Sequence, residues 1–281
     1  MGIARRDFLK LLGAGAVASV LPRPAATVRA GLYAPTDRVY LIRSIDPRFG
    51  VLLSVDDGYS QTFSRIAEVI LQRKCPIAFF PMGRMLHILA NLDGRNLLEE
   101  LVEAGCIIGN HSYSHPYFTH LDDKQIAEEL LNWEKALANA LGTDYLRMMK
   151  ARFPYFRIPF GAGKNTPRVH RVVTSLGYKF VDWTWDEGAI LTDYGAIDHP
   201  EKALQQPLFG KIVEAIKAST RSLRQGDIGL LHSNWWDAYA FEALCERAQA
   251  LGLADPETSL AGTFALLNRI EDGNRWVSGG F

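Results

Sequence analysis

The sequence has few cysteines, and neither sign of charge predominates. Three cysteines, Cys75, Cys106 and Cys245, occur among 281 residues. Three are too few for a disulfide framework or a cysteine-rich zinc site. Basic and acidic side chains number 31 each, so the formal net charge is zero. A neutral chain has little to drive counterion release from a polyanion, so nucleic acid is not a predicted partner.

The cysteines have no predicted catalytic role. Cys75 precedes one predicted strand and Cys106 begins the next. A disulfide between them is geometrically possible in an oxidising compartment. It requires a suitable Cα separation and facing Cβ vectors. Three free thiols are the alternative.

No apolar run near the N-terminus is long enough for a comfortable membrane span. Residues 11–21 are apolar, whereas a spanning helix needs roughly 20 residues. A basic start, a short apolar core and small residues after it indicate an export signal. The pair Arg5-Arg6 resembles the bacterial twin-arginine signal, which exports folded proteins. We predict a signal over residues 1–30, with a periplasmic or secreted protein after cleavage. An uncleaved signal would leave the protein tethered to the membrane.

The remaining chain reads as a single domain. Apolar residues make up 48% and charged residues 22%, values ordinary for a globular protein. Neither an internal repeat nor a low-complexity linker is found after residue 36. We therefore predict one domain over 31–281, with its core at about 50–270.

Strand and helix patterns alternate through this core. Short apolar runs predict strands at 51–55, 77–80, 106–109, 155–158, 178–183 and 228–232. Amphipathic spacing and capping residues predict helices at about 60–73, 97–105, 122–141, 166–176, 211–224 and 239–251. Continuous alternation predicts parallel strands with helices outside, as in a barrel or a closely related sheet.

Segment 51–58 is the most informative stretch of the chain. A buried strand ends there in two adjacent carboxylates, Asp56 and Asp57, followed by Gly58. Like charges at a buried strand end repel one another unless a cation lies between them. The segment therefore predicts a metal ion, an arginine or both as its partners.

Polar residues follow several of the other predicted strands. In parallel α/β folds the active site lies at the carboxyl ends of the strands. We expect these side chains to meet at one edge: Asp56, Asp57, His111, His115, Arg157, Asp182, Asp186 and His232.

His111 and His115 are four residues apart, a spacing that places two imidazoles on one face of a helix or tight turn. With one carboxylate of the Asp56-Asp57 pair they form a set of two histidines and one aspartate. Such a set leaves a position for water and is typical of catalytic zinc. A pair of surface loop histidines is the alternative.

Four segments together resemble the NodB-type polysaccharide deacetylases, carbohydrate esterase family four. They are SVDDG at 54–58, HSYSH at 111–115, RIPFG at 157–161 and LLH at 230–232. The resemblance covers roughly residues 50–270. It implies a distorted (β/α) barrel of about seven strands and a divalent metal such as Zn²⁺, Co²⁺ or Ni²⁺. It also implies hydrolysis of N-acetyl, and sometimes O-acetyl, groups on a polysaccharide or cell-wall glycan.

The resemblance assigns roles to individual residues. Asp56 matches the general base, and Arg157 matches the arginine that orients it. His232 matches the general acid. The metal ligands of the family correspond to Asp57, His111 and His115. A backbone N–H near Phe160 is expected to stabilise the oxyanion.

The sequence departs from the family where an Asp-Trp pair usually tunes the general acid. Here WTWD at 183–186 is followed by Glu187, and we predict that Asp186 takes this role. Asp182 and Glu187 are the alternatives. Phe160, Trp185 and Trp235 are predicted to contact the sugar, because tryptophans at a rim can form stacking walls.

Two other functions stay open. One is a metal hydrolase of the same fold acting on a small C–N or ester substrate. The other is a non-catalytic glycan-binding relative, for which Asp56 and His232 together would have no use. No Gly-x-Ser-x-Gly elbow occurs, so a serine nucleophile is not indicated.

We expect replacement of both Arg5 and Arg6 by lysine to retain the precursor inside the cell, because the export route reads the arginine pair. Fractionation followed by immunoblotting measures this. Arg23→Lys, outside the pair, is the matched control. Normal appearance of the double variant outside the cytoplasm would contradict the predicted route.

Overall fold

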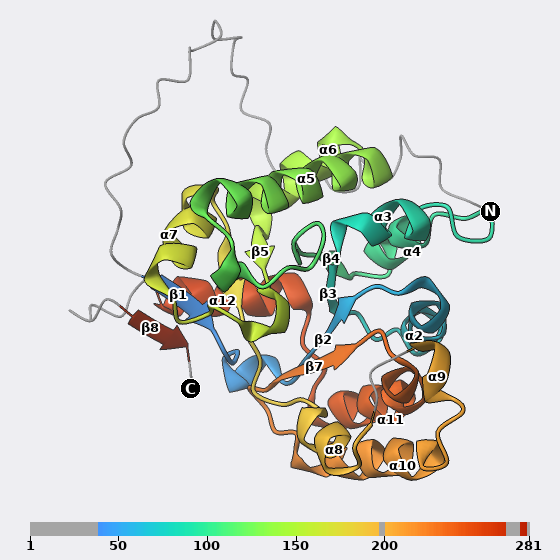
Figure 1. Ribbon diagram of the computed structural model, residues 1–281. Helices are drawn as coiled ribbons and strands as arrows, with labels where there is room; N and C mark the ends of the chain where they lie inside the picture. Colours follow the sequence, from blue (N-terminus) through green and yellow to red (C-terminus); the bar gives the residue numbers. More distant parts are fainter. Residues whose placement is uncertain (1–38, 197–199, 268–275, 280–281) are drawn as a thin grey trace, which may run out of the picture. The chain divides into compact units, whose positions relative to one another are not determined.

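Parallel pairing between strands decides where the polar residues meet. The computed structural model describes residues 39–196, 200–267 and 276–279 (Figure 1). The signal peptide predicted over 1–30 lies outside these residues. The strands are β1 Val39–Ile42, β2 Leu52–Asp57, β3 Ala78–Pro81, β4 Ile107–Ile108, β5 Tyr155–Phe156, β6 Lys179–Val181, β7 Ile228–His232 and β8 Trp276–Gly279.

The strands form two four-stranded sheets, β5-β6-β1-β8 and β4-β3-β2-β7, and all of their pairings are parallel. Two backbone contacts join the sheets. Asn110, after β4, donates to the carbonyl of Tyr155 in β5 at 2.9 Å. On the other side, Leu230 of β7 donates to the carbonyl of Trp185 at 2.8 Å. The strands thus form the predicted distorted barrel, and β1, which the sequence did not predict, adds a strand beside β6.

Helices lie outside the strands (Figure 1). Their bounds are α2 Ser60–Arg73, α3 Gly83–Leu89, α4 Leu97–Glu103, α5 Asp123–Leu141, α6 Thr143–Arg152, α7 Pro167–Ser175, α8 Gly188–Asp193, α9 Pro200–Ala203, α10 Phe209–Ser219, α11 Trp235–Leu251 and α12 Pro256–Leu267. Among the helices of the described ranges, none combines the length and apolar character needed to cross a bilayer.

Two helices show how local sequence sets the boundaries. Before α5, the side chain of Asp122 accepts from the backbone of Gln125, whose own side chain accepts from the backbone of Asp122. This capping box satisfies two donors at the helix start. Before α11, the side chain of Asn234 accepts from the backbone of Asp237 at 2.8 Å. That cap starts α11 four residues before the predicted Tyr239.

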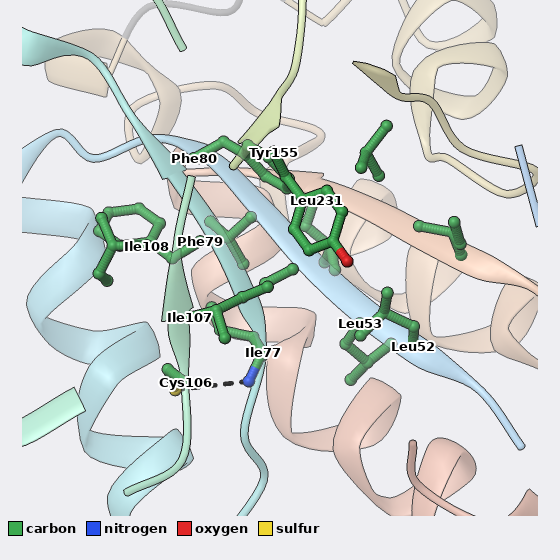
Figure 2. Close-up of a cluster of buried hydrophobic side chains, with 14 of the residues drawn as sticks. Leu52, Leu53, Ile77, Phe79, Phe80, Cys106, Ile107, Ile108, Tyr155 and Leu231 are labelled. Carbon is green, nitrogen blue, oxygen red and sulfur yellow. Dashed lines mark hydrogen bonds between the residues drawn. The ribbon is translucent and has the colours of Figure 1, made fainter. Parts of the chain in front are cut away.

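The core is built on β2, whose six residues are all buried. Figure 2 shows its leucines among apolar side chains of β3, β4, β5 and β7. From α2, Phe63 stacks on Phe79 of β3 with centroids 4.0 Å apart. Burying an aromatic or aliphatic side chain of this size contributes roughly 1.5–3 kcal/mol. The strand that carries Asp56 and Asp57 is therefore firmly anchored in the core.

The three cysteines are buried and free. Cys106 accepts a hydrogen bond from the backbone N–H of Ile77 at 3.4 Å, which ties the start of β4 to the start of β3 (Figure 2). The possible bridge between Cys75 and Cys106 is therefore not formed in this structure.

Candidate metal centre and active site

The backbone around the site adopts conformations that most residues avoid. Asp57, Ser112, His115 and Phe160 have φ angles of 74°, 62°, 66° and 57°. These four make up most of the non-glycine residues with positive φ in the described parts of the chain. Each such residue costs of the order of 1–3 kcal/mol and persists only where its surroundings enforce it. Their concentration here indicates that the loops are shaped to aim side chains.

A close approach of two strands places His111. Gly109 follows β4, and a Cβ atom there would lie 2.4 Å from the ring of Phe80. Only glycine permits this contact, which brings the end of β4 against β3. Asn110 then turns the chain, because its side chain accepts from the backbone of Ser112 at 2.8 Å. His111 consequently faces the end of β2.

Three side chains converge at this point: Asp57, His111 and His115. The Nε2 atoms of the two histidines are 3.2 Å apart. The Oδ1 atom of Asp57 lies 3.6 Å from Nε2 of His111 and 3.4 Å from Nε2 of His115. This Oδ1 is buried, and no hydrogen-bond donor among the described residues reaches it. Two imidazole nitrogens and a buried anionic oxygen this close together form a donor set that fits a divalent cation.

The ionisation states suit a cation as well. Burial raises the pKa of Asp57, but the neighbouring imidazoles of His111, His232 and His115 lower it to about 2. Burial and the neighbouring His111 lower the pKa of His115 to about 4. Both groups are therefore unprotonated at neutral pH, the form in which they bind metals. The Nδ1 atom of His111 lies 2.9 Å from the carbonyl of Arg157, which leaves Nε2 as the free lone pair.

Arg157 is fully buried and orients Asp56. Its Nη1 donates to Oδ1 of Asp56 at 3.0 Å and to the hydroxyl of Ser54 at 2.8 Å. Its Nη2 and Nε donate to the carbonyls of Asp182 and Val181. The other oxygen of Asp56, Oδ2, lies 3.7 Å from Nε2 of His111. Asp56 is thus held through one oxygen while the other faces the metal ligands.

His232 ends β7 and pairs in register with Asp56. Its Nδ1 lies 2.9 Å from Oε1 of Glu187, which is 1% exposed. Burial lowers the pKa of His232, but the charge and hydrogen bond of Glu187 and the charges of Asp57 and Asp56 raise it well above its usual value. His232 is therefore protonated at neutral pH, and Nε2 is the nitrogen that can donate to a substrate.

The predicted partner of His232, Asp186, is replaced by its neighbour. Asp186 instead accepts from the indole N–H of Trp183 at 2.6 Å and from the backbone of Gly188 at 2.9 Å. Glu187 immediately precedes α8, where the chain turns its side chain inward and that of Asp186 outward. Asp182, the other alternative, pairs with Arg43 and Lys164 at 3.1 Å each. The contact with His232 belongs to Glu187.

The aromatic predictions have mixed outcomes. Phe160 is 55% exposed and lies edge-on to His115, with ring centroids 4.3 Å apart. Trp185 is only 8% exposed, because its backbone bridges to Gly229 of β7. Its indole N–H donates to the hydroxyl of Ser222. The predicted role of Trp185 in stacking on sugar is therefore wrong. Trp235 is half-buried, with its ring 6.3 Å from that of Tyr239.

Sequence reasoning missed Tyr117, which is 47% exposed and stacks on Phe160 at 4.1 Å. Its position two residues after His115 was the only available signal. Trp183 lies beside the guanidinium of Arg157, with 5.8 Å between the guanidinium carbon and the ring centroid.

The sequence profile of the polysaccharide deacetylase family matches residues 45–181, a range that includes Asp56, Asp57, His111, His115 and Arg157. Residues 45–181 are therefore similar to a polysaccharide deacetylase domain. A bifunctional xylanase/deacetylase of Pseudobutyrivibrio xylanivorans is 22% identical over 201 residues, 72% of this chain. Other curated relatives are chitin, chitooligosaccharide and peptidoglycan deacetylases. The chain spans 28%, 40% and 59% of the first three of these relatives.

Solved structures share the fold of this chain. A CE4 family pseudoenzyme from Bacillus anthracis superposes with a TM-score of 0.56 at 18% identity, over 76% of this chain and 66% of its own. A family 4 carbohydrate esterase from Streptomyces lividans, in complex with acetate, gives a TM-score of 0.53 at 23% identity, over 73% and 90%. At these identities the similarity establishes the NodB-type (β/α) barrel fold.

We expect His111→Ala to abolish stoichiometric binding of Zn²⁺, because it removes one of three converging ligands. Loss of a ligand weakens binding far more than the 10- to 100-fold typical of changes around the ligands. Metal content after dialysis, measured by elemental analysis, tests this. His120→Ala, an exposed histidine on the same loop, is the matched control and should retain the metal. Full metal content in His111→Ala would contradict the ligand assignment.

Proposed function

We propose that this protein is a metal-dependent deacetylase that removes N-acetyl, and in some substrates O-acetyl, groups from a polysaccharide or cell-wall glycan. One observation carries the proposal: the triad of Asp57, His111 and His115 lies beside an Asp56 that Arg157 orients. His232, held by Glu187, ends the strand next to Asp56. A metal site, a base and an acid at one strand edge are the parts that hydrolysis of an acetyl group requires.

Asp56 acts as the general base. Oδ1 is engaged by Arg157, so Oδ2 is the atom that accepts the proton of the attacking water. A positioned base contributes about 10²- to 10⁴-fold to the rate. The fixed orientation matters because Arg157 cannot move without leaving the hydroxyl of Ser54 and two backbone carbonyls without their donor.

His232 acts as the general acid. An amine leaves poorly unless it is protonated, and the raised pKa of His232 keeps a proton available at neutral pH. With Nδ1 occupied by Glu187, Nε2 delivers this proton. A backbone N–H in the turn at Phe160, where φ is positive, stabilises the oxyanion.

Asp57, His111 and His115 would hold the divalent cation, for which Zn²⁺, Co²⁺ and Ni²⁺ are the candidates. When bound, such a cation supplies Lewis acidity that polarises the acetyl carbonyl and acidifies the attacking water. Two histidines and one carboxylate leave a coordination position for water and substrate.

The glycan substrate is supported by two features. Curated relatives of the domain are named as deacetylases of chitin and peptidoglycan. Phe160 and Tyr117 present a stacked pair of exposed rings next to His115, a surface suited to the apolar face of a sugar. The signal predicted over residues 1–30 would place this activity outside the cytoplasm, where such glycans lie, after export by the twin-arginine machinery.

Substitutions of the neighbouring carboxylates Asp56 and Asp57 should impair the protein in different ways. Asp56→Asn keeps the shape but cannot accept a proton, so we expect the metal to remain and acetate release to fall by about 10²- to 10⁴-fold. Asp57→Asn removes an anionic ligand, so metal affinity should fall first and activity with it. His232→Ala should keep its metal and lose more activity on amides than on esters, because an alkoxide leaves with less help.

Acetate released from N-acetylglucosamine oligomers and from small acetate esters, together with metal content, measures these effects. Asp193→Asn, an exposed acid at the end of α8, is the control. If Asp56→Asn loses its metal while Asp57→Asn keeps it, the two roles are exchanged. Activity on small esters alone would indicate a small-substrate hydrolase. Binding of glycan without acetate release by the wild type would indicate a non-catalytic relative.

A further inference from the structure

Behind His232 lies a second carboxyl group, Asp237, that the mechanism above does not use. It sits in the first turn of α11 and is 0% exposed. Side-chain atoms of Glu187, His232 and Asp237, one from each, lie within 4.8 Å of one another. Two buried acids therefore lie together with one partly exposed imidazole at the end of β7.

The two ends of Asp237 have different surroundings. Oδ2 accepts from the backbone N–H of His232 at 2.7 Å and from the side chain of Asn234 at 3.0 Å. Oδ1 is buried and has no hydrogen-bond partner among the described residues. Glu187 is divided in the same way, because Oε1 lies against His232 while its buried Oε2 is also without a partner.

Each of these two neighbouring buried carboxyl groups has one acceptor oxygen that lacks a donor, and a proton can supply it. A single proton between them turns two unsatisfied acceptors into one hydrogen bond. Leaving each unsatisfied would cost about 1–3 kcal/mol, and more for a charged group. Two ionised carboxylates in contact would add repulsion that is strong in a buried site.

We propose that Asp237 and Glu187 share one proton, with protonated Oδ1 of Asp237 donating to Oε2 of Glu187 while Oε1 of Glu187 accepts from Nδ1–H of His232. The arrangement makes Asp237 a positioning residue for the proposed general acid. The two carboxyl groups then carry one negative charge, which balances the one positive charge of the imidazolium.

The electrostatics of the cluster agree with this assignment. Burial and the facing charge of Glu187 raise the pKa of Asp237 well above its usual range, against the opposing effect of His232. The charged groups that act most strongly on His232 are Glu187 beside α8 and Asp57 and Asp56 of β2. A neutral Asp237 adds no further negative charge near His232. Its hydrogen bond can therefore hold the orientation of Glu187 without raising the pKa of His232 further.

Asparagine and glutamine variants distinguish a shared proton from two ionised carboxylates. In Asp237→Asn an amide N–H takes the place of the shared proton, and the charge on Glu187 is unchanged. We expect the alkaline limb of the kcat–pH profile, which reports loss of the His232 proton, to stay within about half a pH unit of the wild type. In Glu187→Gln the negative charge moves to Asp237 and away from the group that accepts from Nδ1 of His232. The midpoint of the alkaline limb should shift to lower pH by about one unit or more.

If both carboxylates are ionised, Asp237→Asn removes a negative charge and lowers the alkaline limb about as much as Glu187→Gln does. That result would overturn the shared proton. Asp237→Leu has a side chain of similar size but no hydrogen-bond donor, so it should not keep the wild-type pH profile. A wild-type profile in Asp237→Asn would then be due to the hydrogen bond that its amide donates to Glu187.

A measurement independent of activity uses the infrared spectrum. At neutral pH the wild type should show the C=O stretch of a protonated carboxyl group that Asp237→Asn lacks, with or without metal. Absence of this difference band would overturn the proposal and leave the proposed deacetylase function untouched. Binding of two Zn²⁺ ions per wild-type chain, but one per Asp237→Asn chain, would show that a cation rather than a proton joins the two carboxyl groups. If the wild type shows the band but releases no acetate from any acetylated substrate, the result counts against the proposed function and not against the shared proton.

Discussion

One buried guanidinium connects the parts of the site. Arg157 bonds Asp56 and Ser54 of β2 through one nitrogen and the chain after β6 through the others. Its own carbonyl accepts from the ring of His111 and so selects the nitrogen that faces Asp57. Removing one partner of a buried ion pair typically costs 3–5 kcal/mol, a large share of the 5–15 kcal/mol that stabilises a domain. The orientation of Asp56 and the link between β2 and β6 therefore depend on the side chain of Arg157, and the tautomer of His111 depends on its backbone carbonyl.

The strand ends and the convergence of Asp57, His111 and His115 could be predicted from the sequence for a physical reason. A buried parallel strand has a strong apolar signal, and its first polar residues must lie at the shared edge of the sheet. Asp56, Asp57 and His232 each lie at the end of such a strand. The short strands β1 and β8 and helices α3, α6, α8, α9 and α12 were missed, since their patterns are weak or brief. Their formation depends on packing against neighbours that the sequence does not reveal.

The residues around His232 show where sequence reasoning ends. Asp186 and Glu187 are adjacent acids of the same type, and only the backbone turn before α8 decides which of them points inward. Trp185 resembled a rim residue because it lies beside them, but its bridge to Gly229 buries it. The position of Asp237 near the imidazole was not predicted. The cap at Asn234 starts α11 earlier than expected, and this cap was not recognised in the sequence. Distances within a polar cluster follow from such local turns and not from composition.

The central claim is that the converging atoms of Asp57, His111 and His115 bind one divalent cation. Anomalous scattering at the zinc edge, from a crystal of the protein loaded with Zn²⁺, tests it most directly. The account predicts one peak about 2.0–2.2 Å from Nε2 of both histidines and from Oδ1 of Asp57, with Asp56 free of the metal. A peak bound by Asp56 instead of Asp57, or no peak between the two histidines, would contradict it.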